Sequence, residues 1–310
     1  MTVDAGALAR GRWTAAAVRA LRGPKEAVDP WRPLAVLAER ERAAGGGSRR
    51  WLTVFLAGAE CPFTCVFCDL WRQTLDGPTP PGAVPAQIAA ARAWPGLEPP
   101  FDGVKLYNAS NFFAERAVPA ADDAAILAAV EPFGRVLVEC HPRWVGRRAL
   151  AWAEALAARG AVLEVAMGLE TIHPRAMPRL GKSLTRQRFE EAAATLLAAG
   201  AAVRAFVLVG APWVPPAETV EWTVATARAA VAAGATHVSL IPVRGGNGAL
   251  DELARRGEWA PPELVDLEAA LDRCLAEMAA PPAPQLVVTA DVWDLDRLAS
   301  CRRCATPRRE

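Results

Sequence analysis

The chain has 310 residues, of which 52% are hydrophobic and 22% charged, and its 35 Lys+Arg against 34 Asp+Glu leave a net charge of +1. Such a composition excludes an intrinsically disordered chain and a protein that binds nucleic acid through bulk positive charge. Uncharged stretches such as Ala229 to Val243 have fifteen residues, fewer than the roughly 18 that cross a bilayer, so we expect no membrane segment. Arginines interrupt the first 24 residues, where a secretory signal needs an apolar run, and we expect a cytoplasmic protein.

Residues 1–48 alternate apolar and basic side chains, contain prolines at Pro24, Pro30 and Pro33, and end in the sequence GGGS. A Gly-rich run of this kind is typical of a flexible junction. We therefore predict an N-terminal helical extension over residues 1–48 that is separate from the domain after it.

From Trp51 onward, short apolar runs alternate with alanine-rich helical segments, and this alternation is typical of βα units. Because βαβ crossovers are right-handed, six such strands are expected to form a curved parallel sheet with the helices outside. The predicted fold is α/β, a partial (β/α)6 TIM-type barrel, with a flat doubly wound sheet as the alternative. The predicted strands cover residues 51–56, 103–107, 135–140, 162–168, 203–209 and 237–243, and the predicted helices cover 84–94, 120–131, 147–159, 186–199 and 217–233.

The chain after the sixth predicted strand begins with the Gly-rich sequence RGGNG at Arg244 to Gly248. A helix near residues 262–278, a proline-rich break and a strand over 285–289 are expected to follow. We therefore divide the chain into the N-terminal extension, a barrel over 49–248, and a C-terminal cap with a basic tail over 249–310.

Three of the seven cysteines stand together as Cys61, Cys65 and Cys68, a C-x3-C-x2-C arrangement between the first predicted strand and the next helix. An odd number of cysteines in a long, intracellular-looking chain indicates metal binding or thiol chemistry instead of a disulfide framework. Zinc and an iron–sulfur cluster are the two alternatives. A structural zinc site usually takes four ligands as two pairs, whereas a [4Fe–4S] cluster on three thiolates leaves one iron open to a substrate or cofactor.

With Phe67 before its third cysteine, the motif resembles the C-x3-C-x-aromatic-C signature of the radical S-adenosylmethionine (radical SAM) superfamily, and the resemblance spans about residues 51–245. It implies a [4Fe–4S] cluster on Cys61, Cys65 and Cys68, with S-adenosylmethionine bound at the open iron. It also implies reductive cleavage of that cosubstrate to a 5′-deoxyadenosyl radical, which abstracts hydrogen from a substrate. A flavodoxin- or ferredoxin-type electron donor is implied as a partner.

Polar residues at the ends of the other predicted strands resemble the cosubstrate-binding residues of that superfamily. Asn108 and Ser110 stand where members usually carry a Gly-Gly-Glu segment that binds the methionyl amino group, a segment this chain lacks. Glu139 resembles the third-strand acid of coproporphyrinogen-oxidase-like members. Glu170, in the sequence MGLET, resembles the residue that binds the ribose hydroxyls, and Lys182 stands where relatives place a cation against the cosubstrate carboxylate.

Further residues at the barrel mouth are expected to contact the adenine or the substrate. The backbone around Val243, in the sequence SLIPV, resembles the edge that contacts adenine. A small substrate bound above the barrel would meet polar contacts and an aromatic wall formed by Trp213 or Trp293. The expected polar contacts are Tyr107, His141, Arg244 and Asn247. The candidate catalytic residues are therefore Tyr107, Lys182 and Arg244.

The sequences VKLYNASNFF, VECHP, MGLET and LGKSLTRQRFEEA together resemble the radical SAM subunit of archaeosine synthase and its bacterial relatives, in the Elongator and methylthiotransferase branch. This resemblance implies a 7-deazaguanine-derived base in tRNA as one substrate, which an enzyme would have to extrude into its pocket. We favour a small-molecule or nucleoside-like substrate, with tRNA as the first alternative and a noncatalytic metal- or RNA-binding protein as the second. The candidate phosphate ligands are Arg147, Arg148, Arg255, Arg256 and the arginines of the C-terminal tail.

Two further cysteines, Cys301 and Cys304, form a C-x-x-C pair in the C-terminal tail. Thiols at this spacing bind metals or form a redox pair, and together with Cys140 they would offer a second metal site. The sequence contains no complete second motif, and free thiols are the interpretation we prefer. Cys274 occurs at core spacing in a predicted helix and is expected to pack.

Overall fold

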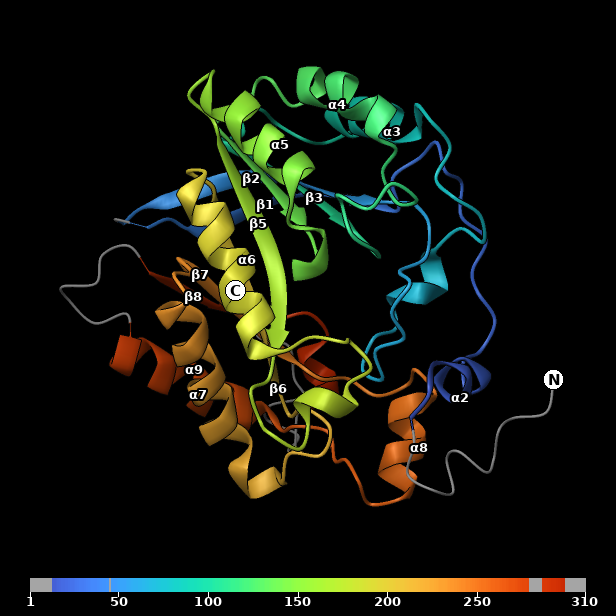
Figure 1. Cartoon of the computed structure of the whole chain (residues 1–310), viewed down its shortest axis with the longest axis vertical. Helices are drawn as coiled ribbons and strands as arrows, with labels where there is room; N and C mark the ends of the chain where they lie inside the picture. The colour runs from blue at the N-terminus through green and yellow to red at the C-terminus, as the bar shows by residue number, and fades with distance from the viewer. Residues whose placement is uncertain (1–12, 45, 279–285, 299–310) are drawn as a thin grey trace.

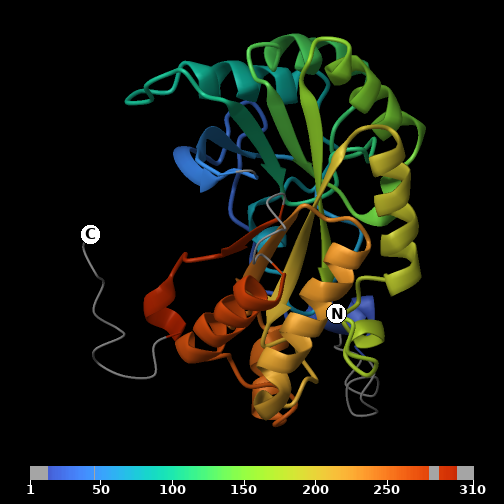
Figure 2. The same cartoon turned by 90° about the vertical axis from the view of Figure 1, so that its left-hand side faces the viewer.

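The computed structural model of the chain describes residues 13–44, 46–278 and 286–298. In this part of the chain eight strands form one sheet in the order β1 to β8, in which β1 runs antiparallel to β2 and all later neighbours are parallel. The sheet curls into a partial barrel with helices along its outer face (Figure 1, Figure 2). The strands are β1 (Ala35–Arg42), β2 (Ser48–Leu56), β3 (Gly103–Asn108), β4 (Arg135–Glu139), β5 (Val162–Glu170), β6 (Ala202–Val209), β7 (His237–Pro242) and β8 (Val287–Ala290).

The strand order decides between the two predicted sheets. A doubly wound sheet reverses its strand order at a switch point, whereas here every strand pairs with the next one in the sequence. Helices α3 to α7 each connect two successive parallel strands, so the predicted partial barrel is confirmed. The α-helices of the described residues are α2 (Ala15–Ala20), α3 (Ala83–Arg92), α4 (Asp123–Ala129), α5 (Arg147–Ala157), α6 (Arg186–Ala198), α7 (Thr219–Ala232), α8 (Ala249–Arg255) and α9 (Leu264–Met278), and the short 3-10 helices are η1 (Leu70–Gln73), η2 (Ala120–Asp122), η3 (Pro142–Trp144), η4 (Met177–Arg179), η5 (Pro216–Glu218) and η6 (Leu295–Leu298).

The main hydrophobic core joins the strands to the helices. Trp152 of α5 packs edge-to-face on Phe112, with ring centroids 5.0 Å apart. Ile88 of α3 and Phe189 of α6 belong to the same core and are completely buried. Burial of this apolar surface stabilises the barrel and holds the strand ends, from which the functional loops depart.

The N-terminal segment corrects the prediction of a helical extension over residues 1–48. Its described helix, α2, is short, and the sequence AVLAERER forms strand β1, which pairs with β2 along its whole length. The charged residues of this strand alternate between two environments, with Glu39 and Glu41 partly buried and Arg40 and Arg42 exposed. The predicted flexible junction is the hairpin turn between the two strands, where Gly46 and Gly47 adopt φ values of 101° and 74° that favour glycine.

The C-terminal segment extends the sheet as well as covering its outside. The strand predicted over 285–289 is present as β8 and pairs in parallel with β7, while α9 packs against α7. The tail predicted to be a cap therefore also supplies hydrogen-bond partners to the edge of β7, which would otherwise be unpaired. None of the helices in the described ranges is long and apolar enough to cross a membrane.

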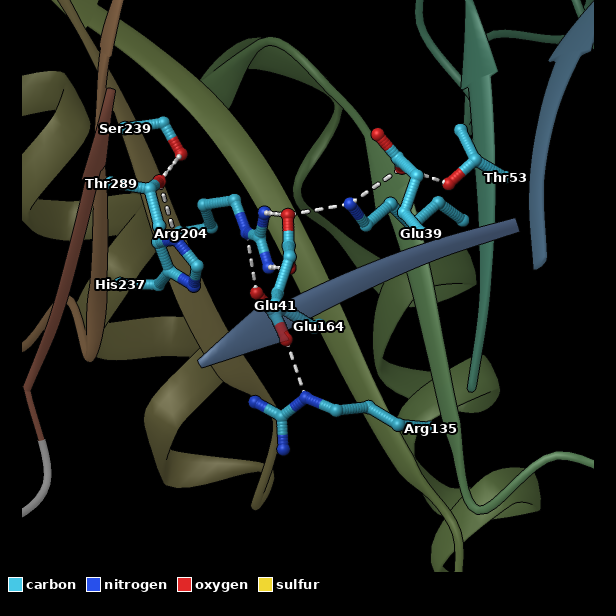
Figure 3. A network of polar contacts seen from close by, with 10 residues as sticks. Glu39, Glu41, Thr53, Arg135, Glu164, Arg204, His237, Ser239 and Thr289 are labelled. Atoms are coloured by element: carbon cyan, nitrogen blue, oxygen red, sulfur yellow. Dashed lines mark hydrogen bonds and ion pairs between the residues drawn. The ribbon is translucent and has the colours of Figure 1, made fainter. Parts of the chain in front are cut away.

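A buried network of charges fills the barrel at the N-terminal ends of the strands (Figure 3). Arg204 of β6 donates to Glu164 Oε1 at 2.7 Å and to Glu41 Oε2 at 3.0 Å. Lys105 of β3 binds Glu41 Oε1 at 2.5 Å, and Arg135 pairs with Glu164. β1 lies at one edge of the sheet, and β6 is several strands away from it. The contact between Glu41 of β1 and Arg204 of β6 therefore joins distant strands across the N-terminal end of the partial barrel. We call this set the floor network; its charged members are Glu39, Glu41, Lys105, Arg135, Glu164 and Arg204.

Candidate active site

The three cysteines of the motif lie in the loop after β2, at the carboxyl end of the sheet, where barrels of this type carry their active sites. All three thiols are free and partly buried. Burial raises the pKa of each thiol, that of Cys68 to about 12, so the thiols are neutral at pH 7. The three cysteines lie within eight residues of one loop. The predicted aromatic residue of the motif, Phe67, packs against an apolar cluster that includes Trp213.

The donors of this loop fit an iron–sulfur cluster by their chemistry. Within the described residues, no three His, Cys, Asp or Glu side chains already stand in an arrangement that ligates a metal ion. Three thiols in one short loop are nevertheless the donors that hold such clusters, and metal binding releases their protons. An N–H group already lies beside the first sulfur, since Asn111 Nδ2 is 3.4 Å from Cys61 Sγ.

Two segments from later in the chain hold the cysteine loop in place. The N–H of Val66 donates to the carbonyl of Leu180 at 3.0 Å, and Asn247 Nδ2 donates to the carbonyl of Val66 at 2.8 Å. Gly181 lies so close to the loop that a Cβ there would be 2.6 Å from the carbonyl oxygen of Thr64. Two segments, LGK (residues 180–182, the LGK segment) and the RGGNG loop (residues 244–248), therefore both hold the cysteine loop in position.

Two predicted cosubstrate ligands, Glu170 and Lys182, form a buried ion pair beside the cysteine loop. Glu170 ends β5 with a φ of 66°, a strained value for a residue with a side chain, and such strain clusters at functional sites. Gly168 makes room for the pair, because a Cβ there would overlap both Glu170 Oε1 and Lys182 Nζ. Burial alone would lower the pKa of Lys182, but the Glu170 carboxylate raises it, so the lysine remains charged.

Three more predicted ligands meet at the ends of β3 and β4. The N–H of Asn108 donates to Glu139 Oε2 at 3.2 Å, and Asn108 Oδ1 accepts the N–H of Ser110 at 2.9 Å. The second bond orients the amide, and Asn108 Nδ2 is buried with no hydrogen-bond partner among the described residues. Burial raises the pKa of Glu139 to about 7. The ends of β3 and β4 therefore offer a hydrogen-bond donor, Asn108 Nδ2, that has no partner among the described residues. They also offer the Glu139 carboxyl group, whose charge depends on what binds beside it.

The other predicted residues, Tyr107, Val243 and Arg244, already contact other groups of the protein. Tyr107 packs with its ring 5.7 Å from that of Phe55, and burial raises the pKa of its phenol. The N–H of Val243 donates to the carbonyl of Val209, at the end of β6, at 3.0 Å. This bond uses one of the two backbone groups of Val243 that were predicted to contact adenine. Arg244 is bound by Asp291 at 2.9 Å. A substrate would have to compete with Asp291 for this guanidinium.

The structure adds two residues to which the sequence pattern assigned no role in holding the motif, Asn111 and Asn247. Their bonds to the cysteine loop join positions 50 and 181 residues apart in the chain. No local pattern reveals such pairs; the available signal is that both are amides in loops that follow predicted strands.

The predicted second metal site is only partly within the described residues. Cys140 is buried, and its thiol donates to the carbonyl of His141 at 3.4 Å. Cys301 and Cys304 lie outside the described residues, so their joint site with Cys140 stays a prediction. Cys274 is fully buried in the core, where its spacing predicted it.

The chain matches no protein-family model and no curated protein. Among solved structures it is similar to SuiB from Streptococcus suis, with a TM-score of 0.52 and 10% identity over 78% of this chain and 50% of that one. Coproporphyrinogen III oxidase (HemN) from Escherichia coli, described as a radical SAM enzyme, aligns with a TM-score of 0.47 and 13% identity over 85% and 55% of the two chains. The radical SAM methyltransferase TsrM from Kitasatospora setae, with cobalamin and a [4Fe–4S] cluster bound, gives 0.47 and 18% over 65% and 39%.

These are similarities of fold at low sequence identity. The chain spans 39–55% of the length of these three solved proteins. The likeness to SuiB agrees with the partial barrel described above.

Proposed function

We propose that this chain is a radical SAM enzyme that holds a [4Fe–4S] cluster on Cys61, Cys65 and Cys68 and binds S-adenosylmethionine beside it. The observation that carries the proposal is the buried ion pair of Glu170 and Lys182 next to the C-x3-C-x2-C loop. Buried ion pairs add little net stability, since desolvation offsets their attraction. Charged groups collected beside a cluster of thiols at the carboxyl end of a barrel are instead typical of a functional site.

The groups around the loop complement a cosubstrate that carries an amino acid and a ribose. Asn108 Nδ2 is a donor without a partner among the described residues, and Lys182 is a cation; both suit a carboxylate. Glu139 and Glu170 offer carboxyl oxygens to an amino group and to ribose hydroxyls. Cluster and cosubstrate, when bound, supply reductive cleavage of a carbon–sulfur bond and abstraction of hydrogen from the substrate. The protein's own contribution is to orient these groups and to exclude water.

For the substrate we propose a small molecule or a nucleoside-like compound, such as a 7-deazaguanine derivative, in preference to tRNA. Three of the four described arginines predicted to bind phosphates are paired within the protein, and the fourth, Arg147, is exposed. Arg148 donates to both carboxylate oxygens of Asp123, at 2.9 and 2.6 Å. Arg255 and Arg256 both bind Glu252. Nucleic-acid affinity comes from positive charge that phosphates can neutralise, and these pairs reduce it. The arginines of the tail lie outside the described residues.

Anaerobic reconstitution of the full chain with iron and sulfide tests the proposal. We expect a four-iron cluster, an electron paramagnetic resonance (EPR) spectrum of the reduced cluster that changes when S-adenosylmethionine is added, and release of 5′-deoxyadenosine on reduction. Reduction by dithionite and by a flavodoxin or ferredoxin, measured side by side, tests the expected donor class. Zinc without iron, or a cluster whose spectrum ignores the cosubstrate, would favour a noncatalytic metal- or RNA-binding protein.

Matched variants separate ligation from general damage. Cys65→Ala is expected to abolish the four-iron cluster, whereas Cys274→Ala, which removes a buried thiol from α9, is expected to keep it. Glu170→Ala is expected to weaken cosubstrate affinity at least tenfold. Glu277→Ala, which breaks a surface ion pair with Arg228, is its control. Full cosubstrate affinity in Glu170→Ala would show that the ribose assignment is wrong.

A further inference from the structure

Asn111 links the first cysteine of the motif to the end of β4. The side chain is 3% exposed. Its Nδ2 donates to Cys61 Sγ at 3.4 Å, and its Oδ1 accepts the N–H of His141 at 2.7 Å. A backbone N–H can only donate, so the bond to His141 requires the amide oxygen on that side. The NH2 group is thereby directed at the sulfur, and the orientation does not depend on the choice between two amide flips.

His141, which donates its N–H to Asn111, is itself held by further contacts. His141 Nε2 lies 3.1 Å from the carbonyl of Lys182, and its Nδ1 accepts the N–H of Arg143 at 3.0 Å. Its ring packs 4.4 Å from that of Phe63, a residue of the cysteine loop. Asn111 is thus fixed from β4, from the LGK segment and from the cysteine loop together, and its N–H group is preorganised toward Cys61.

We propose that Asn111 is a positioning residue that raises the reduction potential of the cluster by hydrogen-bonding the Cys61 sulfur; this inference rests on the proposed function. Cluster potentials depend on the hydrogen bonds that their sulfurs accept. An N–H···S bond withdraws electron density from the thiolate and stabilises the reduced cluster, which carries one more negative charge. Residues outside the ligand set tune metal sites in this way. The Asn111 bond is strongest in the reduced state, and its loss lowers the potential.

Asn247 provides a matched control in the same part of the structure. Its Oδ1 also accepts a backbone N–H, that of Leu250 at 2.8 Å, and its Nδ2 also donates to the cysteine loop. The difference is the acceptor, because among the described residues Asn247 Nδ2 donates to the carbonyl oxygens of Val66 and Cys68, at 2.8 and 3.3 Å, and to no sulfur. Replacing either asparagine by leucine removes the same groups at similar volume, and only one of the two replacements removes a bond to sulfur.

The experiment is an EPR-monitored redox titration of the reconstituted full chain and of Asn111→Leu and Asn247→Leu. In Asn111→Leu we expect the ratio of reduced to oxidised cluster at a fixed potential to fall about tenfold, which corresponds to about 59 mV toward lower potential for a one-electron couple. In Asn247→Leu we expect a lower cluster content per chain with an unchanged potential. Asn111→Asp keeps the acceptor for the His141 N–H, removes the donor, and is expected to shift the potential in the same direction.

The outcomes separate this inference from the function on which it rests. A wild-type chain that assembles no four-iron cluster would overturn the proposed function itself. A wild-type cluster with equal potentials in the wild type and Asn111→Leu would overturn only the role of Asn111. Equal shifts in both leucine variants would do the same, since they would indicate a general loosening of the loop. Loss of the cluster from both Asn111 variants, with retention in Asn247→Leu, would assign Asn111 a purely structural role.

Discussion

Replacing Arg204 by methionine tests whether the floor network is held by charge balance. Arg204 is 2% exposed and bonds two carboxylates, Glu164 and Glu41. The substitution keeps most of the side-chain volume and removes one positive charge from a set with three acids and three bases. Glu164 keeps Arg135, and Glu41 keeps Lys105, so each acid retains one partner. Breaking a buried ion pair costs about 3–5 kcal/mol of stability. Because each acid keeps one partner, we expect a loss near the lower end of this range, about 3 kcal/mol.

Urea unfolding followed by circular dichroism measures this loss as a fall in the free energy of unfolding. The double variant Arg204→Met/Glu41→Gln restores neutrality, and we expect it to be more stable than Arg204→Met alone by about 1 kcal/mol or more, within the range of coupling for residues in one network. A loss below about 1 kcal/mol in Arg204→Met, or a double variant less stable than the single one, would show that uncompensated buried charge does not dominate here.

Two other predictions follow from the same structure. Gly168→Ala is expected to displace Glu170 and Lys182, because its Cβ overlaps both side chains, and to weaken S-adenosylmethionine binding at least tenfold with little change in cluster content; equilibrium binding and iron counting check this. Burial alone would raise the pKa of Glu41 and Glu164, but Arg204 lowers both to about 2, together with Lys105 at Glu41 and Arg135 at Glu164. Each carboxylate therefore stabilises the fold above its ordinary pKa of 4.5, and this stability should be lost as pH falls from about 4.5 to about 2, which acid unfolding monitored by circular dichroism measures.

The strands β2 to β7 and the helices between them were predictable from the sequence, because each unit has its own hydrophobic periodicity. A buried parallel strand is a short apolar run, and an alanine-rich stretch between two runs is a helix wherever the chain lacks Gly and Pro. β1, in contrast, was not predicted from the sequence. In its sequence AVLAERER only Val36 is buried, and it is a strand because β2 offers a register in which its acids face the barrel.

The candidate site likewise combines a local motif that the sequence predicted with contacts that only the structure shows. The spacing of Cys61, Cys65 and Cys68 is local, so the motif predicted a metal site before any fold was known. Glu170 and Lys182 were predicted from a resemblance, and the structure pairs them beside the cysteine loop. Their roles toward a cosubstrate remain proposals.

The βα units and the thiol donors of the cysteine loop follow from local sequence, since both depend on residues a few positions apart. The folded chain is needed to show which distant side chains contact those units. Asn111 reaches Cys61 across 50 positions, and Arg204 reaches Glu41 across 163. Closure of the barrel brings these pairs together, because hydrogen bonds and buried charges act over a few ångströms in space, whatever the separation of the residues along the chain.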